Sequence, residues 1–284
     1  MLNYPITDSH IHLWDIIHLD YSWLAEIPTL NKTHLPADFH NDAKSYSIDS
    51  VIFVQAECLP SQSLDEVQWV SDLAIHNPNI KGIVAWAPLE RSSAAKQHLS
   101  HLQKNSLVKG IRRIIQFEDD FDFCLQAEFI EGVQLLADLN LPFDICVKTH
   151  QLPQVINMVE QCPRVKFVLN HMGKPNIDKQ EFEPWKKHLS QLAHFPNVWC
   201  KISGLVTEAD HQRWENHHLE PYISHSINEF GFDRVMFGSD WPVLNLAANY
   251  TRWIESLCEL LKNHPSADLK KLFHDNAHKF YGLN

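Results

Sequence analysis

The sequence predicts an α/β protein folded as one (β/α)8 (TIM) barrel, with residues 1–284 forming a single domain. Eight short apolar segments rich in β-branched residues alternate with amphipathic patterns of helical period, and this alternation is typical of a barrel of parallel strands. A doubly wound open sheet is the alternative fold. It usually carries a glycine-rich turn after its first strand, and this chain has no such turn there.

The predicted strands are nearly continuous apolar runs, as expected for strands covered on both faces. They lie at residues 5–14, 50–57, 80–89, 108–116, 142–148, 166–172, 198–204 and 234–242. Helical patterns occur at residues 63–77, 127–140, 152–162, 181–195, 249–262 and 267–282. Ser63 and Glu66 are spaced as a capping box. The stretch from Asp15 to Ala43 is expected to form a long loop over the barrel mouth.

The composition argues against several classes of partner. The net charge is −11, from 24 basic and 35 acidic residues, whereas a general nucleic-acid binder would show a basic surface. We see neither a basic and apolar leader at the start nor an apolar run as long as a membrane span. The six cysteines form no C-x-x-C pair. We therefore expect a cytoplasmic protein with reduced thiols, and no nucleic-acid or membrane partner.

Polar side chains gather near the carboxyl ends of seven of the eight predicted strands. They are His10 and His12, Gln55 and Glu57, Arg112 and Gln116, Lys148 and His150, His171, Lys201 and Ser203, and Asp240. Because residues two apart share a strand face, His10 and His12 should point the same way. Core packing does not explain this set, since buried polar groups need partners. The carboxyl ends of barrel strands meet at one face, where we expect an active site.

Seven motifs in a fixed order carry a resemblance to a known family. They are DSHIHLWD, VQAE, GIRRIIQ, HQLPQV, NHMGKP, KISGL and GSDWPV, and they extend over nearly the whole chain. With His10-x-His12, His171 and Asp240, the chain resembles the amidohydrolase superfamily, and within it the lactonase branch that includes L-fuconolactonase and pyrone-dicarboxylate lactonase. The resemblance implies a distorted (β/α)8 barrel that hydrolyses an ester or a lactone.

The resemblance also implies a metal site. His10, His12 and Asp240 would bind one divalent metal, zinc by preference, with His171 as a further ligand. A two-metal site would need a lysine at the end of the fourth strand, where this chain has Arg112 and Gln116. Some members of the branch work without a metal, so catalysis that requires no cofactor is the alternative.

Lactone hydrolysis needs an activated water, a stabilised oxyanion and a proton for the leaving alkoxide. Asp240 is the predicted general base, which takes the proton of the water and delivers it to the leaving oxygen. His10, His12 and His171 would either bind the metal or polarise the lactone carbonyl. The structural alternatives are an N-cap role for Asp240 and hydrogen-bonded core positions for the histidines.

Seven residues are assigned to substrate binding: Arg112, Lys201, Glu57, His150, Gln116, Trp14 and Trp241. Arg112 would contact a carboxylate, hydroxyls or the carbonyl oxygen, or else form an internal ion pair with Glu57. Lys201 has the alternatives of pairing with Glu57 or Asp240. His150 is as compatible with a loop as with the site wall, and the tryptophans are as compatible with plain packing as with a sugar ring.

The favoured function is hydrolysis of a sugar lactone to its aldonic acid. The alternatives are a metal-dependent decarboxylase or hydratase of an aromatic or unsaturated acid, a lactonase of an acidic pyrone-type lactone, and a catalytically idle metal-binding barrel. A dicarboxylate substrate would need several cations, and only Arg112, Lys201 and Lys148 are candidates, which favours a neutral sugar lactone. The expected partner is this small molecule, and a homodimer is left open.

Overall fold

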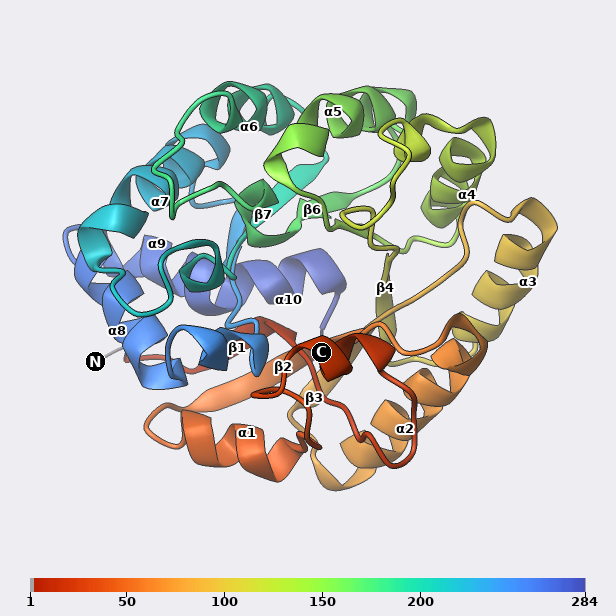
Figure 1. Cartoon of the computed structure of the whole chain (residues 1–284), viewed down its shortest axis with the longest axis horizontal. Helices are drawn as coiled ribbons and strands as arrows, with labels where there is room; N and C mark the ends of the chain where they lie inside the picture. Colours follow the sequence, from red (N-terminus) through yellow and green to blue (C-terminus); the bar gives the residue numbers. More distant parts are fainter. Residues whose placement is uncertain (1–2, 284) are drawn as a thin grey trace.

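Eight parallel strands form one sheet in chain order, from β1 to β8, in the computed structural model, which describes residues 3–283. Figure 1 shows the strands at the centre and helices around them. The strands are β1 (Ile6–Ile11), β2 (Ile48–Val54), β3 (Ile80–Ala85), β4 (Val108–Arg112), β5 (Phe143–Ile145), β6 (Phe167–Leu169), β7 (Val198–Ile202) and β8 (Val235–Phe237). The predicted (β/α)8 barrel of one domain is confirmed. The predicted domain limits, residues 1 and 284, lie outside the described residues.

A helix follows each strand, and two more close the chain. They are α1 (Pro36–Ala43), α2 (Ser63–His76), α3 (Ser92–Leu102), α4 (Ala127–Asp138), α5 (Leu152–Gln161), α6 (Trp185–Ala193), α7 (Asn216–Phe230), α8 (Tyr250–Leu260), α9 (Ser266–Lys270) and α10 (Asn276–Tyr281). No amphipathic pattern marked α3 or α7, whose sequences show only polar helical stretches around their histidines. Among the described residues, none of these helices combines the length and the apolarity that a membrane crossing requires.

The barrel closes between β8 and β1 through a few irregular contacts rather than a regular ladder, which makes it distorted. Ile11 forms an isolated parallel bridge with Trp241. The amide of Asp240 donates to the carbonyl of His10 at 2.8 Å, and the amide of His12 donates to the carbonyl of Trp241 at 2.6 Å. These bonds place the side chain of Asp240 beside the two histidines of β1.

The amino-terminal end of the barrel is closed by the C-terminal segment. Phe280 and Tyr281 of α10 pack against apolar side chains of several strands, namely Ile52, Val54, Val84, Val168 and Met236. Asn276 donates from Nδ2 to the carbonyls of Phe232 and Val235, both at 2.7 Å. Figure 1 shows α10 running across the middle of the barrel. The carboxyl ends of the strands therefore form the open face.

Two local expectations are wrong. The stretch from Asp15 to Ala43 contains the helix α1 and a 3-10 helix at Ser22–Glu26. Ser63 and Glu66 make no capping box, because the Ser63 hydroxyl donates to the carbonyl of Pro60 at 2.8 Å. The Glu66 carboxylate instead accepts from the amide of Ala56 at 3.1 Å, just beyond β2. Glu66 therefore bonds to the segment after β2 and not to the N-terminus of its own helix.

Candidate active site

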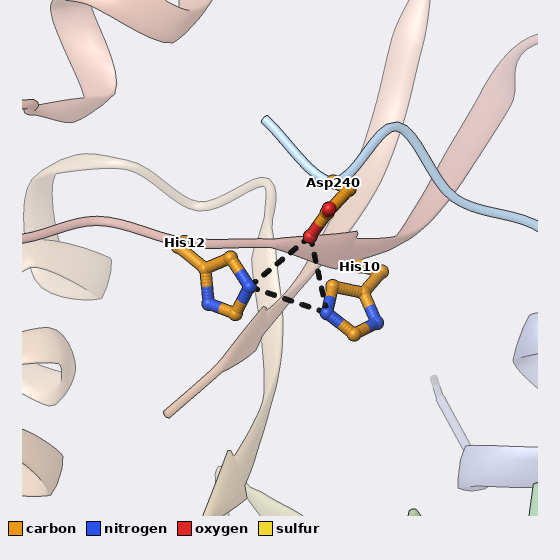
Figure 2. Close-up of side chains that lie close together, drawn as sticks. All are labelled: His10, His12 and Asp240. Carbon is orange, nitrogen blue, oxygen red and sulfur yellow. Dashed lines mark hydrogen bonds and ion pairs between the residues drawn. The ribbon is translucent and has the colours of Figure 1, made fainter. Parts of the chain in front are cut away.

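Three histidine rings surround one carboxylate oxygen at the carboxyl end of the barrel. The Oδ1 atom of Asp240 lies 3.6 Å from Nε2 of His10, 3.3 Å from Nε2 of His12 and 3.8 Å from Nε2 of His171. Figure 2 shows the rings of His10, in β1, and of His12, just beyond it, turned toward Asp240, which follows β8. All four predicted catalytic residues are buried and lie together. Their catalytic roles stay a prediction.

The backbone is strained where it presents side chains to this site. Asp240, His171, Glu57 and Lys174 have φ angles of 62°, 53°, 58° and 50°. Such left-handed conformations are unfavourable for residues other than glycine, at a cost of about 1–3 kcal/mol each, and they cluster at functional sites. All four residues follow strand ends. The side chains of all four residues line the cavity at the barrel mouth.

Gly204, in the KISGL motif, makes room for the His171 ring. Its φ is 62°, and a Cβ atom there would meet Nδ1 of His171 at 2.4 Å. Ser203, the preceding residue, holds the same nitrogen through its hydroxyl at 2.9 Å. The segment after β7 therefore fixes the orientation of this histidine.

Hydrogen-bond partners hold the rings of His10 and His12 on both sides. Nζ of Lys201 lies 3.3 Å from Nδ1 of His10, and since an ammonium group can only donate, this nitrogen accepts. Nε2 of His10 lies 3.2 Å from Nε2 of His12 and 3.4 Å from Nη1 of Arg112. His12 donates from Nδ1 to the carbonyl of Val54 at 2.7 Å, which leaves its own Nε2 unprotonated. This row of bonds holds both rings in place.

Burial dominates the protonation of the cluster. Desolvation lowers the pKa of His10 and of His12, and it lowers the pKa of His171 to about 3. Burial alone would raise the pKa of Asp240, but the imidazoles of His171 and His12 beside the carboxylate lower this pKa to about 2. At neutral pH the site thus holds neutral rings around an ionised carboxylate, the state that a general base requires.

The cluster forms the floor of a cavity of about 450 Å³, which we call the mouth pocket. Its lining combines apolar and polar side chains: His12, Ser22, Trp23, Ile27, Ala56, Glu57, Cys58, Leu59, Pro60, Trp86, Arg112, Ile114, Gln116, Phe117, Cys146, His171, Lys174, Asp240 and Val243. This volume and this mixture are typical of a small-molecule site. Three predicted substrate-binding residues, Glu57, Arg112 and Gln116, lie in this wall.

Arg112 brings a buried positive charge to the mouth pocket. Its side chain donates from Nη2 to the carbonyl of Gln55, and Nη1 lies 3.4 Å from Nε2 of His10. Its buried Nε atom has no hydrogen-bond partner among residues 3–283. Arg112 does not form the alternative ion pair with Glu57. The Glu57 carboxylate instead accepts from the Gln55 side chain at 2.8 Å. Arg112 therefore retains donor capacity for a ligand.

Lys201 lies beneath the site and not in the pocket wall. It is fully buried, and its Nζ atom is 2.6 Å from Oδ2 of Asp144 and 2.8 Å from the carbonyl of Ser9. Lys201 therefore forms an ion pair with Asp144 inside the barrel. It does not line the pocket, as a contact with substrate would require, and it does not pair with Glu57 or Asp240. Asp144 was not among the predicted site residues, although its alternation with Cys146 on β5 directs both inward.

Three other predicted substrate-binding residues lie outside the pocket wall. Trp14 and Trp241 are fully buried, and their indole groups donate to the carbonyl of Lys32 at 2.7 Å and to Asp42 at 2.9 Å. His150 is exposed and stacks on Phe121. Packing interactions occupy both tryptophans, so the structure corrects the expected placement of all three residues.

Lys174 and Trp23 are among the pocket residues that sequence reasoning missed. Lys174 lies in the wall, 3.9 Å from the Glu208 carboxylate, and it belongs to the NHMGKP motif that drew attention only to His171. Trp23 comes from the 3-10 helix after β1, and its indole donates to the carbonyl of Ala56 at 2.8 Å. The long segment between β1 and β2 was expected to cover the mouth, but nothing in its pattern singled out Trp23.

The donor set fits a divalent metal ion. Nε2 atoms of His10 and His12 and a carboxylate oxygen of Asp240 lie within 4.8 Å of one another, and zinc accepts such nitrogen and oxygen ligands. His12 offers an unprotonated Nε2 while Nδ1 is bonded to the backbone, an arrangement common for metal-binding histidines. These three residues could hold a metal.

Fold and site together define a class of protein, namely barrel hydrolases with a histidine and aspartate cluster at the carboxyl-end mouth. The chain belongs to the amidohydrolase family, since the family model described as Amidohydrolase matches residues 7–283. It is 33% identical over 267 residues to an L-fucono-1,5-lactonase of Burkholderia multivorans, covering 88% of each chain. It is 28% identical to an L-fucono-1,5-lactonase of Burkholderia ambifaria, covering 98% of this chain and 95% of that relative.

A solved structure shows the same arrangement of the chain. It is an amidohydrolase from Burkholderia multivorans with bound zinc, with a TM-score of 0.90 and 30% identity, and the match covers 99% of this chain and 100% of that one. The predicted superfamily and lactonase branch are confirmed by these comparisons. The protein is an enzyme of the hydrolase class.

Proposed function

We propose that the protein hydrolyses a sugar lactone, of the aldono-lactone kind related to L-fuconolactone, to the aldonic acid. The observation that carries the proposal is the ionised carboxylate of Asp240 at the floor of the mouth pocket, with neutral imidazoles and a buried arginine around it. The names of the curated relatives support the lactone as substrate class. A cytoplasmic location and a homodimer stay predictions.

Asp240 activates the water in this mechanism. Its carboxylate orients a water against the lactone carbonyl and takes a proton as the C–O bond forms. When the tetrahedral intermediate collapses, the ring C–O bond breaks and the same carboxyl group gives the proton to the leaving alkoxide. The product is an open-chain hydroxy acid. Asp240 returns to its ionised form, so one residue serves as base and then as acid.

Arg112 stabilises the negative charge that develops on the carbonyl oxygen. Its guanidinium is fixed by the carbonyl of Gln55, so a ligand meets a preorganised donor. Nε2 of His171 also faces the carboxylate of Asp240, and the hydroxyl of Ser203 holds the Nδ1 atom of the same ring. A metal held by His10, His12 and Asp240 would supply Lewis-acid polarisation of the carbonyl.

The walls of the mouth pocket suit a polyhydroxylated ring better than a dicarboxylate. Trp23 and Trp86 offer apolar faces, and Glu57 and Gln116 offer hydrogen-bond partners for hydroxyl groups. Among the described residues, the basic side chains in the lining are Arg112 and Lys174, and Lys174 already faces Glu208. An acidic pyrone with two carboxylates would find few cations here.

The test measures proton release from a panel of sugar lactones, with purified protein before and after chelation. We expect turnover of at least one sugar lactone above spontaneous hydrolysis, and Asp240→Asn should lower kcat by about 10²–10⁴-fold because the base is lost. Asp119→Asn, an exposed aspartate near the mouth, is the matched control and should keep full activity.

Each outcome has a defined meaning. Activity that survives chelation assigns catalysis to Asp240 and the histidines alone, and loss with rescue by zinc makes His10 and His12 ligands. Near-full activity of folded Asp240→Asn contradicts the mechanism. Turnover of no sugar lactone contradicts the substrate class, and a second panel of acidic aromatic lactones and carboxylic acids would then separate the two remaining chemistries.

A further inference from the structure

A second cluster of metal-ligating side chains lies at the opposite end of the barrel from the mouth pocket. It consists of Asp49 near the start of β2, His274 in a π-helical turn (Lys271–Asp275), and His278 in α10. We call it the base cluster. Its three ligand atoms lie within 4.8 Å of one another, and its side chains are partly exposed, between 19% and 43%. The proposed hydrolysis uses none of them.

The distances within the base cluster match those of a bound transition metal. Oδ2 of Asp49 lies 3.6 Å from Nε2 of His274 and 3.4 Å from Nε2 of His278. Ligands at 2.0–2.2 Å from a tetrahedral zinc ion are separated by about 3.3–3.5 Å. Histidines four residues apart lie on one helix face, and these two rings are stacked with centroids 4.3 Å apart. Both histidines therefore present a ring nitrogen to the same carboxylate oxygen of Asp49.

Neighbouring groups hold the base cluster in a form that can bind a cation. Nδ1 of His274 lies 2.8 Å from Oδ1 of Asp275, so the ring donates there and turns an unprotonated Nε2 toward Asp49. The facing nitrogen and carboxylate oxygen are both acceptors, and only a proton or a cation can join them. The Ser50 hydroxyl donates to Oδ2 of Asp49 at 2.7 Å and helps to lower the pKa of this carboxyl group.

Two further polar contacts define what a cation would meet. Nε2 of His278 lies 2.9 Å from the hydroxyl of Thr7, which a bound ion would displace or take as a neighbour. Lys270 pairs with Oδ1 of Asp275 at 2.9 Å, the same oxygen that lies 2.8 Å from Nδ1 of His274.

We propose that the base cluster is a second, structural site for a borderline divalent cation such as zinc, formed by His274, His278 and Asp49. Two imidazole nitrogens and one carboxylate oxygen make a donor set suited to this class of metal. The ion would join the C-terminal segment to β2. A structural role fits this position, because the amino-terminal end of a barrel contributes to stability while the active site lies at the carboxyl end.

The test titrates metal-free protein with zinc by calorimetry and measures thermal unfolding with and without zinc. We expect the double variant His274→Ala/His278→Ala to bind one zinc ion fewer per chain than the wild type and to lose the rise in unfolding temperature due to that ion. Its lactone turnover should equal that of the wild type. Asp49→Asn is a milder second variant with the same expected loss.

His18→Ala is the matched control, because His18 also faces a carboxylate, at 2.7 Å from Asp15, but within residues 3–283 no second histidine completes that pair. It should bind as much zinc as the wild type. Equal zinc binding and equal thermal shifts in wild type and double variant would overturn the proposal, as would a wild type that binds no zinc outside the mouth pocket.

Discussion

Asp240 shows how position decides the chemistry of a single residue. Its carboxylate is buried, which disfavours an anion, yet the surrounding imidazoles keep its pKa at about 2. The sequence suggested this residue through its place at a strand end and a family motif. It could not supply the pKa, because the histidines that set it come from β1 and from the segment after β6.

The same protonation states predict a flat pH profile. The reaction needs an ionised Asp240 and neutral rings, and the pKa of His171 is lowered from 6.5 to about 3. We therefore expect kcat/KM, corrected for spontaneous hydrolysis, to stay constant from about pH 8 down to about pH 5 and to fall only when His171 takes up a proton. An acid limb centred near 6.5 would contradict the buried, neutral state of this histidine.

At the scale of elements, strands were easier to predict than the contacts between elements. Continuous β-branched runs predicted all eight strands, because a strand that is buried on both faces is apolar at nearly every position. No amphipathic pattern marked α3 or α7, because each carries histidines and polar residues that weaken the apolar stripe. The capping box at α2 was wrong because Glu66 has a partner at the end of β2, which no local pattern records.

Glu66 gives α2 a pH-dependent contribution to stability. Burial raises its pKa from 4.5 to about 7, so the folded state binds a proton more tightly than the unfolded state. Stability from this group is fully present below about pH 4.5 and is lost as the pH rises through 7. We expect Glu66→Gln to be more stable than the wild type above pH 7, by up to about 3 kcal/mol, and to differ little near pH 4.5.

Urea unfolding at several pH values between about 4.5 and 8 measures this difference in the free energy of unfolding. Asp65→Asn, an exposed neighbour on the same helix, is the control and should show no such dependence. A constant difference between Glu66→Gln and the wild type across this range would show that Glu66 does not titrate there.

At the scale of the whole molecule, a row of buried polar contacts connects the barrel strands to the C-terminal helix α10. The Tyr281 hydroxyl of α10 donates to Asp144 of β5, Asp144 pairs with Lys201 of β7, and Lys201 donates to His10 of β1. The alternation of strands and helices predicted the barrel, since every β-α unit repeats the signal. It could not predict this row, whose members are up to 271 positions apart and meet only inside the closed barrel.

Removing one end of the buried ion pair should destabilise the protein strongly. Lys201→Met leaves Asp144 without its cation in the barrel interior, and we expect a loss of about 3–5 kcal/mol in the free energy of unfolding. The double variant Lys201→Met/Asp144→Asn removes both charges and should recover part of this loss. Urea unfolding of the three proteins gives the comparison, and equal stability of single and double variants would contradict an energetic coupling.

The four residues with left-handed backbones at the mouth mark positions where stability and activity oppose each other. Asp240 and Glu57 occupy a conformation that glycine would adopt at lower cost, so glycine there would relieve the backbone while removing the functional group. A search for thermostable variants that ignored activity would be drawn to these positions. Engineering of this enzyme should therefore hold them constant and seek stability in the helix layer.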